Sequence, residues 1–131
     1  MSKQPFPLQL SNYFFTHQEA TANPEHEINQ SKESNAHYDI NAVVSKINDR
    51  NSYGLEVTAT LNPEKSVNAP YFIKITAFGI IEASDAINQK EIEKLVSSAG
   101  SQLMIGAIRE RIAEMTSRGP WPANYINFIQ L

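Results

Sequence analysis

Apolar and polar residues alternate along much of the first two thirds of the chain, and this pattern predicts strands. The clearest case is residues 52–62, where every second side chain from Tyr53 to Leu61 is apolar. A period of two places one face of a strand against a core and the other face in water. Weaker versions of the same pattern predict strands over about residues 6–16 and 37–48.

A fourth strand is predicted over about residues 69–83, and both of its faces are apolar. The apolar side chains are Tyr71, Ile73, Ile75 and Ala77 on one face and Phe72, Phe78 and Ile80 on the other. An antiparallel sheet with helices on one side only would leave the second set in water. The pattern therefore indicates an oligomer contact or a binding groove on one side of this strand.

Residues 17–35 are polar, and the Asn23-Pro24 pair among them is typical of a turn. This composition predicts an exposed crossover loop between the first two strands. The three histidines of the chain, His17, His26 and His37, lie in or beside this segment, at spacings too wide for a helical metal-binding pair. We therefore predict no metal site.

After residue 85 the apolar residues recur every three or four positions, which predicts a helix over about residues 88–118. Its apolar stripe includes Ile92, Leu95, Val96, Ala99, Met104, Ile108 and Ile112. Gly100-Ser101 is expected to break or kink the helix, and Gly119 is expected to end it in the left-handed conformation. Four strands followed by one long, continuous or broken helix predict an α+β fold, with a four-stranded antiparallel sheet and the helix packed on one face.

Residues 119–131 form an uncharged tail that contains the single tryptophan, Trp121. Chain ends usually fray unless they pack, so a tail this apolar is expected to dock. Its target can be the body of the subunit, another subunit or a ligand. Trp121 and Phe128 can therefore serve as a cover for the sheet or as part of a groove.

The length of 131 residues predicts a single domain over residues 1–131. With 11 Lys and Arg against 14 Asp and Glu, the net charge of -3 does not provide the basic surface that nucleic acids need. No apolar stretch is long enough to cross a membrane, and no signal-type run follows Met1. The absence of cysteine excludes disulfides and fits a reducing compartment, so we expect a cytoplasmic protein.

Residue chemistry that would support catalysis is absent from the sequence. The five glycines are scattered and form no phosphate-binding loop. Acidic residues of the predicted helix, such as Glu91 and Glu110, stand beside Lys and Arg at helical spacings, which is typical of a solvated face. We predict that the protein is not an enzyme and uses no cofactor. A small-molecule-binding α+β dimer is the alternative from another class, and it would need an enclosed pocket.

Several segments resemble, in order, the SecB family of protein-export chaperones. The best match is Glu114 to Pro122, which is similar to the Ser-Arg-Gly-aromatic-Pro region at the end of that family's long helix. Ile126-Asn127-Phe128 resembles the Val-Asn-Phe that follows in the family. Tyr13 to Pro24 is similar to the family's first strand and its exit, and Gly79-Ile80 lies where the family's fourth strand has Gly-Ile.

The resemblance implies an ATP-independent holdase that binds unfolded or precursor polypeptides in protein export and translocation. It also implies a homotetramer built as a dimer of dimers. In the family, the loop after the long helix and the second strand line an apolar groove for clients, which here implies Tyr38, Ile40, Val44, Trp121, Tyr125, Ile126 and Phe128. The implied oligomer interface comprises Ile73, Ile75, Ala77, Met104, Ile108 and Ile112.

Two departures from the family pattern weaken the case for docking to the export motor SecA. Family members continue into another helix and an acidic tail, whereas this sequence ends at Leu131. Lys74 stands where the family has an acid, although Glu19 lies near the acids of the first strand. A stand-alone or toxin–antitoxin-associated SecB-like chaperone, or a subunit that guards a single antitoxin, therefore stays open as an alternative.

Overall fold

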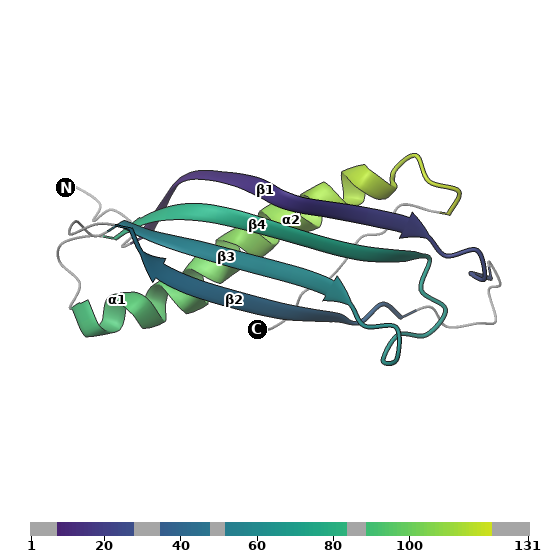
Figure 1. The fold of residues 1–131 in the computed structure, drawn as a ribbon, viewed down its shortest axis with the longest axis horizontal. Coiled ribbons are helices and arrows are strands. Elements are labelled where there is room, and N and C mark those ends of the chain that lie inside the picture. Colours follow the sequence, from purple (N-terminus) through teal and green to yellow (C-terminus); the bar gives the residue numbers. More distant parts are fainter. Residues whose placement is uncertain (1–7, 28–34, 48–51, 84–88, 122–131) are drawn as a thin grey trace, which may run out of the picture.

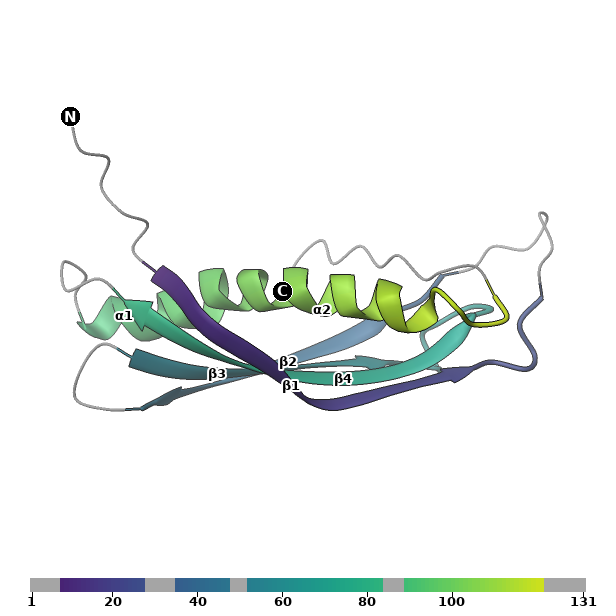
Figure 2. The same cartoon turned by 90° about the horizontal axis from the view of Figure 1, so that it is seen from above.

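Four antiparallel strands form one sheet, and a helical segment runs along one of its faces (Figures 1 and 2). This computed structural model describes residues 8–27, 35–47, 52–83 and 89–121. The strands are β1 (Leu8–Ala22), β2 (Tyr38–Lys46), β3 (Ser52–Leu61) and β4 (Tyr71–Ala83). Their order across the sheet is β1-β4-β3-β2, so β1 and β2 are the two edge strands.

The helical segment consists of α1 (Gln89–Leu95), η1 (Val96–Gly100) and α2 (Ser101–Thr116). η1 is a turn of π-helix, and it takes the place of the break predicted at Gly100-Ser101. A Cβ added to Gly100 would lie 2.7 Å from Ile81 Cδ1 of β4. Glycine therefore lets the helical segment approach the sheet closely at this turn.

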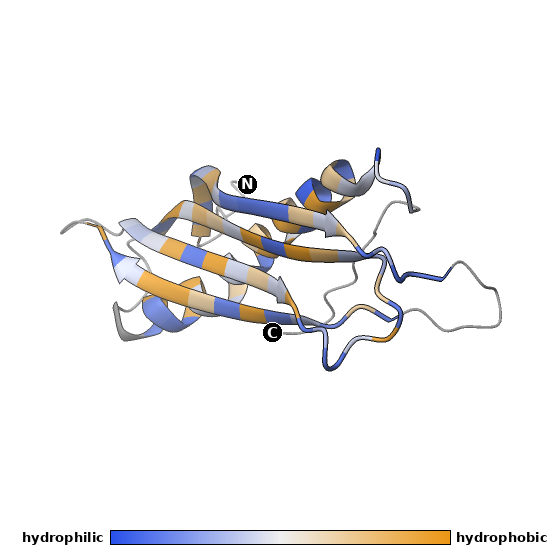
Figure 3. Ribbon diagram, turned by 45° about the vertical axis from the view of Figure 1, so that its right-hand side comes forward, coloured by the Kyte–Doolittle hydropathy of each residue, from blue (hydrophilic) through white to orange (hydrophobic). Residues whose placement is uncertain are grey.

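The core lies between the sheet and the helical segment. The alternate apolar residues of β3, Tyr53, Leu55, Val57, Ala59 and Leu61, are all buried on this side, as the sequence pattern predicts. Figure 3 shows the corresponding alternation of hydrophobic and hydrophilic positions along the strands. Because each large side chain contributes about 1.5–3 kcal/mol on burial, this alternation fixes which face of the sheet the helices cover.

β1 is longer than predicted, because residues 17–22 continue the strand instead of starting the crossover loop. Two register shifts interrupt its pairing with β4, between Leu10 and Asn12 and between Phe15 and His17. Each bulge moves the alternation by one position, and most of this edge strand is exposed. Residues 17–22 therefore show no alternation of apolar and polar side chains that would identify a strand.

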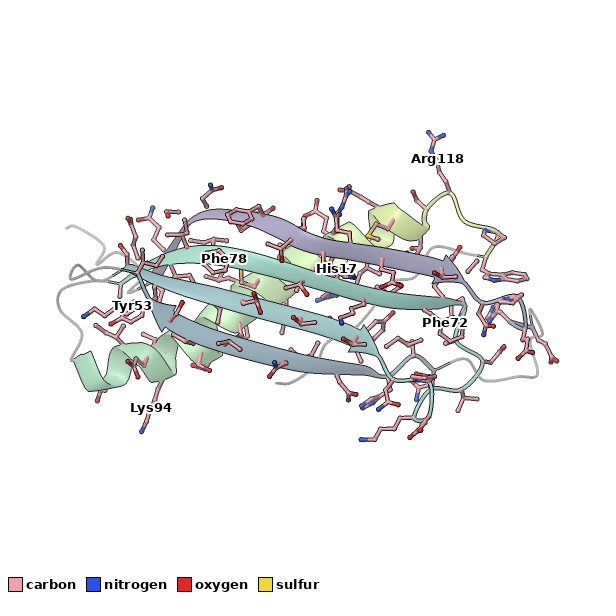
Figure 4. All side chains as sticks on the ribbon, viewed as in Figure 1. His17, Tyr53, Phe72, Phe78, Lys94 and Arg118 are labelled. Carbon is pink, nitrogen blue, oxygen red and sulfur yellow. The ribbon has the colours of Figure 1, made fainter. Side chains whose placement is uncertain are left out.

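Only one face of β4 is covered by a described element. Figure 4, which views the sheet from the side opposite the helices, labels Phe72 and Phe78 on this open face. Phe72 is 40% exposed, and Phe78 lies 5.6 Å from Phe14 between ring centroids. One layer of helices covers one face of β4, so the other face is left for the oligomer contact or binding groove that the sequence pattern indicates, and that cover stays a prediction.

The six residues assigned to the oligomer interface lie in the core of the subunit itself. Ile73, Ile75, Ala77, Met104, Ile108 and Ile112 are each 3% exposed or less. They fill the space between the sheet and the helical segment, and their burial leaves no surface for a second copy. Any contact between subunits must use other residues.

Candidate functional site

A cavity of about 510 Å³ lies where the edge strand β2 faces the beginning of the helical segment. Among the described residues it is lined by Tyr38, Asp39, Ile40, Ala42, Ser97, Ser98 and Ser101, and we call it the β2 pocket. This volume is in the range of cavities that hold ligands. One wall is supplied by a strand and the other by three serines, so apolar and hydroxyl groups meet in one place.

The strand wall combines apolar side chains with a free main-chain edge. Tyr38 is buried, whereas Ile40 and Ala42 on the same face are partly exposed. β2 pairs with β3 in unbroken register from Tyr38 to Lys46, and no strand in the described part of the chain pairs with its other edge. Alternate N–H and C=O groups of an edge strand point outward and can pair with an added strand.

The helical wall holds hydroxyl groups with different partners. Ser98 Oγ donates to the main-chain oxygen of Lys94 at 2.9 Å. Ser101 is fully buried, and its Oγ has no hydrogen-bond partner among the described residues. The Ser98 hydroxyl of the pocket is therefore already bonded, whereas the buried Ser101 hydroxyl is not.

Asp39 is the single charged side chain among the described lining residues. Its carboxylate accepts a hydrogen bond from Asn62 Nδ2 at 3.0 Å, and its Oδ1 lies 3.5 Å from His37 Nε2. No described lysine or arginine lines the pocket. The local charge therefore favours neutral or basic ligands over anions.

Trp121 anchors the other end of the helical segment to the body of the subunit. Its indole N–H donates to the main-chain oxygen of Asn23, just after β1, at 2.9 Å. Its ring lies edge-on to the ring of His26, with 5.0 Å between centroids. Trp121 is not among the described lining residues of the β2 pocket, and in this position it covers the end of the sheet.

Tyr71 of β4 completes this anchor. Its hydroxyl donates to the main-chain oxygen of Trp121 at 2.8 Å and accepts from the Trp121 main-chain N–H at 3.1 Å. A Cβ on Gly119 would overlap the Tyr71 hydroxyl. No described glycine has a positive φ, so the predicted left-handed conformation of Gly119 is wrong. Close approach to Tyr71 accounts for the glycine instead.

The groove residues inferred from the sequence are divided by these positions. Tyr38 and Ile40 line the β2 pocket, and Val44 is a partly exposed residue farther along the same face of β2. Trp121 belongs to the anchor. Tyr125, Ile126 and Phe128 lie outside the described residues.

Comparison with known proteins identifies a similar structure but no similar sequence. No protein-family model matches the chain, and no curated protein sequence matches it. It superposes on a SecB-like chaperone of Mycobacterium tuberculosis, solved in complex with a ChAD peptide from the HigA1 antitoxin, with a TM-score of 0.71. The match covers 95% of this chain and 92% of that chain, at 9% identity.

The chain has a SecB-like fold. The predicted α+β architecture, a four-stranded antiparallel sheet with the helix on one face, is therefore confirmed. At 9% identity the likeness concerns the fold and does not transfer an activity.

Within this SecB-like fold, sequence reasoning missed the helical side of the pocket. Ser97, Ser98 and Ser101 belong to the run Ser-Ser-Ala-Gly-Ser, which contains few strong helix formers. Such a run inside a predicted helix indicates a local departure from α-helix, and the π turn is found there.

Elsewhere in the described chain, no group of three acidic or histidine side chains could hold a metal ion. No described helix is long and apolar enough to span a membrane.

Proposed function

We propose that this protein is an ATP-independent chaperone that binds unfolded or precursor polypeptides and delays their folding or aggregation. The observation that carries the proposal is the β2 pocket, a cavity of about 510 Å³ beside a free strand edge in a SecB-like fold. Apolar side chains such as Ile40 attract exposed apolar segments without any sequence code, at about 25 cal/mol per Å² of buried surface. Main-chain pairing along β2 is equally independent of sequence.

The related fold supports a polypeptide as the ligand. The M. tuberculosis SecB-like chaperone was solved with a peptide bound. The β2 pocket opens beside an edge strand and is not enclosed by converging polar groups, so it fits an extended chain better than the small molecule of the alternative hypothesis.

Between the export role and the toxin–antitoxin role, we favour a stand-alone or toxin–antitoxin-associated chaperone. The M. tuberculosis neighbour was solved with a peptide from an antitoxin. On the open face of the sheet, Glu19 of β1 stands directly opposite Lys74 of β4. A cation beside this acid reduces the negative charge on which docking to SecA would depend.

We further propose that the chaperone works as a homotetramer in the cytoplasm. The residues available for subunit contacts are the exposed apolar ones, such as Phe14 on the open face of the sheet and Leu103 on α2, which are 46% and 40% exposed. Size-exclusion chromatography with light scattering measures the assembly. A monomer at micromolar concentration would contradict the tetramer.

The chaperone proposal is tested by light scattering from heat-unfolded citrate synthase and from reduced insulin, without ATP. We expect the protein to suppress the aggregation of both. If neither client is protected at any ratio, the holdase proposal fails. If a single cognate antitoxin is protected and both unrelated clients aggregate, the protein is a dedicated partner subunit.

A variant of the strand wall locates the activity. Ile40→Asp places a charge in the β2 pocket and should weaken protection of both clients strongly, because apolar client segments would then meet an unpaired carboxylate. Val67→Asp changes a residue that is 56% exposed and does not line the pocket, and it should protect as the wild type does. Equal loss in both variants would place the client site elsewhere.

A further inference from the structure

We propose that the Ser101 hydroxyl hydrogen-bonds the main chain of an extended polypeptide that adds to the free edge of β2. Ser101 would thereby act as a positioning residue that sets the register of the client in the β2 pocket. The inference rests on the proposed chaperone function and adds a specific polar contact to it. The contact would involve the client's amide groups, which every polypeptide possesses.

Ser101 differs from three other hydroxyls of the helical segment and its C-cap, those of Ser98, Thr116 and Ser117. Thr116 Oγ1 donates to the main-chain oxygen of Ile112 at 2.9 Å. Ser98 Oγ donates to Lys94, and Ser117 Oγ donates to Glu114 at 2.7 Å. Each uses a carbonyl three or four residues earlier, which is the usual partner of a helical hydroxyl. Ser101 Oγ is buried without any such bond.

The π turn stands directly before Ser101. In a π-helix the main-chain bonds span five residues instead of four, so the preceding carbonyls are displaced from their α-helical positions. Ser101 begins α2 immediately after η1 and is completely buried. A buried hydroxyl without a partner costs stability, and such a group in a native protein calls for an explanation. A ligand that supplies the missing partner is one explanation.

The nearest source of hydrogen-bonding ligands is the free edge of β2. Ser101 lines the same cavity as Tyr38, Ile40 and Ala42 of this strand. The register of β2 with β3 has no shift along its length, so its outer edge offers regularly spaced main-chain groups. The main-chain amides of a polypeptide that pairs with this edge would lie at the opening of the β2 pocket.

Local charge and lining chemistry restrict the occupant further. Asp39 is the sole charged side chain of the described lining, and no described lysine or arginine lines the pocket to attract an anionic ligand. A phosphate or a carboxylate is therefore disfavoured. A neutral or basic segment that alternates an apolar residue with a polar one fits both Ile40 and Asp39, because successive side chains of a strand point to opposite sides.

The experiment measures binding of a fluorescein-labelled peptide of alternating Tyr and Lys by fluorescence anisotropy. We expect Ser101→Ala to weaken binding about tenfold, because one hydrogen bond to the client is lost. Ser98→Ala is the matched control, because its hydroxyl already bonds to Lys94, and it should change the affinity less than about twofold. Both substitutions exchange serine for alanine in the helical wall of one pocket.

A second readout is the melting temperature without peptide. Ser101→Ala removes an unpartnered hydroxyl and should raise the melting temperature by about 3–6 °C relative to Ser98→Ala.

A third measurement uses a peptide in which alternate amides are N-methylated, so that it cannot pair fully with β2. This peptide should bind the wild type and Ser101→Ala equally weakly.

Each result of these measurements either supports or overturns the proposed contact between Ser101 and the client. Equal affinity of wild type and Ser101→Ala for the unmethylated peptide overturns the role of Ser101, even if client protection is intact. A lowered melting temperature of Ser101→Ala with unchanged affinity identifies a buried water as the partner of the hydroxyl and overturns it as well. If the wild type binds no peptide and protects no client, the chaperone proposal itself fails together with this one.

Discussion

The two ends of the helical segment are built in opposite ways, although both lie on the same face of one sheet. Figure 4 labels Lys94 and Arg118 near these ends. At the C-terminal end, Tyr71 and Trp121 exchange hydrogen bonds and the indole is bonded to Asn23. At the N-terminal end, the segment changes to a π turn and Ser101 is left without a partner beside a cavity.

The difference separates stability from binding. Bonded polar groups and a covered aromatic ring hold the C-terminal end in one arrangement. An unpaired hydroxyl and an open cavity are unfavourable in the free protein, and such features recur at functional sites. We call the C-terminal end, with Tyr71 and Trp121, the closed end, and the N-terminal end, with Ser101 and the β2 pocket, the open end. Substitutions at the closed end should therefore affect folding, whereas substitutions at the open end should affect ligand binding.

The largest effect is expected from Trp121→Ala. The substitution removes a partly buried ring and its bond to Asn23, so it should lower the free energy of unfolding by about 3 kcal/mol in urea denaturation. Phe72→Ala removes an aromatic ring from the open face, where Phe72 is 40% exposed. This control should cost about 1 kcal/mol or less. Similar losses in both variants would show that the closed end is not a special anchor.

Gly119→Ala should destabilise by about 1–3 kcal/mol, because its Cβ would overlap the Tyr71 hydroxyl. Gly106→Ala makes the same substitution in α2 at a position with no atom within 4 Å of the added Cβ. That variant should be more stable by about 0.5–1 kcal/mol, since alanine favours a helix over glycine. Thermal melts of the two variants measure whether each substitution raises or lowers the stability. A stabilising Gly119→Ala would contradict the close contact.

Thr116→Val tests a bonded buried hydroxyl at the closed end. It removes the hydrogen bond to Ile112 while keeping the branched shape, so the free energy of unfolding should fall by about 1 kcal/mol. Ser101→Ala is expected to change stability in the opposite direction. Both hydroxyls are completely buried in α2. If chemical denaturation shows that both substitutions change the free energy of unfolding in the same direction, the distinction between the two ends is lost.

The smallest effect is expected at the exposed contact between α2 and β1. Arg111 donates to Gln18 at 2.5 Å and to Glu114 at 2.9 Å, and it lies 5.9 Å from the centre of the Phe15 ring. Its side chain is 38% exposed, so solvent weakens the ion pair. Arg111→Ala should cost about 0.5 kcal/mol, and Glu114→Gln should cost less as salt is raised. A loss as large as that of Trp121→Ala would place a second anchor here.

The sequence allowed prediction wherever one periodicity dominated. The alternation from Tyr53 to Leu61 identified β3 and its buried face, and the stripe through Ile108 identified the helix. Residues 17–22 were missed because two bulges and solvent on this edge strand removed the alternation.

The candidate site was predictable only in part. Tyr38 and Ile40 could be inferred through the resemblance to SecB, and the cavity does contain them. Ser101 could not, because its proposed role was inferred from a π turn and from a buried hydroxyl without a partner, which are properties of the packed structure. The burial of Ile75 and Met104 within one subunit likewise depends on how tightly the helix packs on its own sheet.

The bulges of β1 also limit how the protein can associate with copies of itself. A fibre grows only when both edges of each sheet offer a regular row of amides to the next molecule. The shifted register near Leu10 and Phe15 interrupts that row at one edge, while β2 remains regular. Edge-to-edge association that uses β1 is therefore hindered, and β2 is the edge at which an added strand can pair without a shift in register.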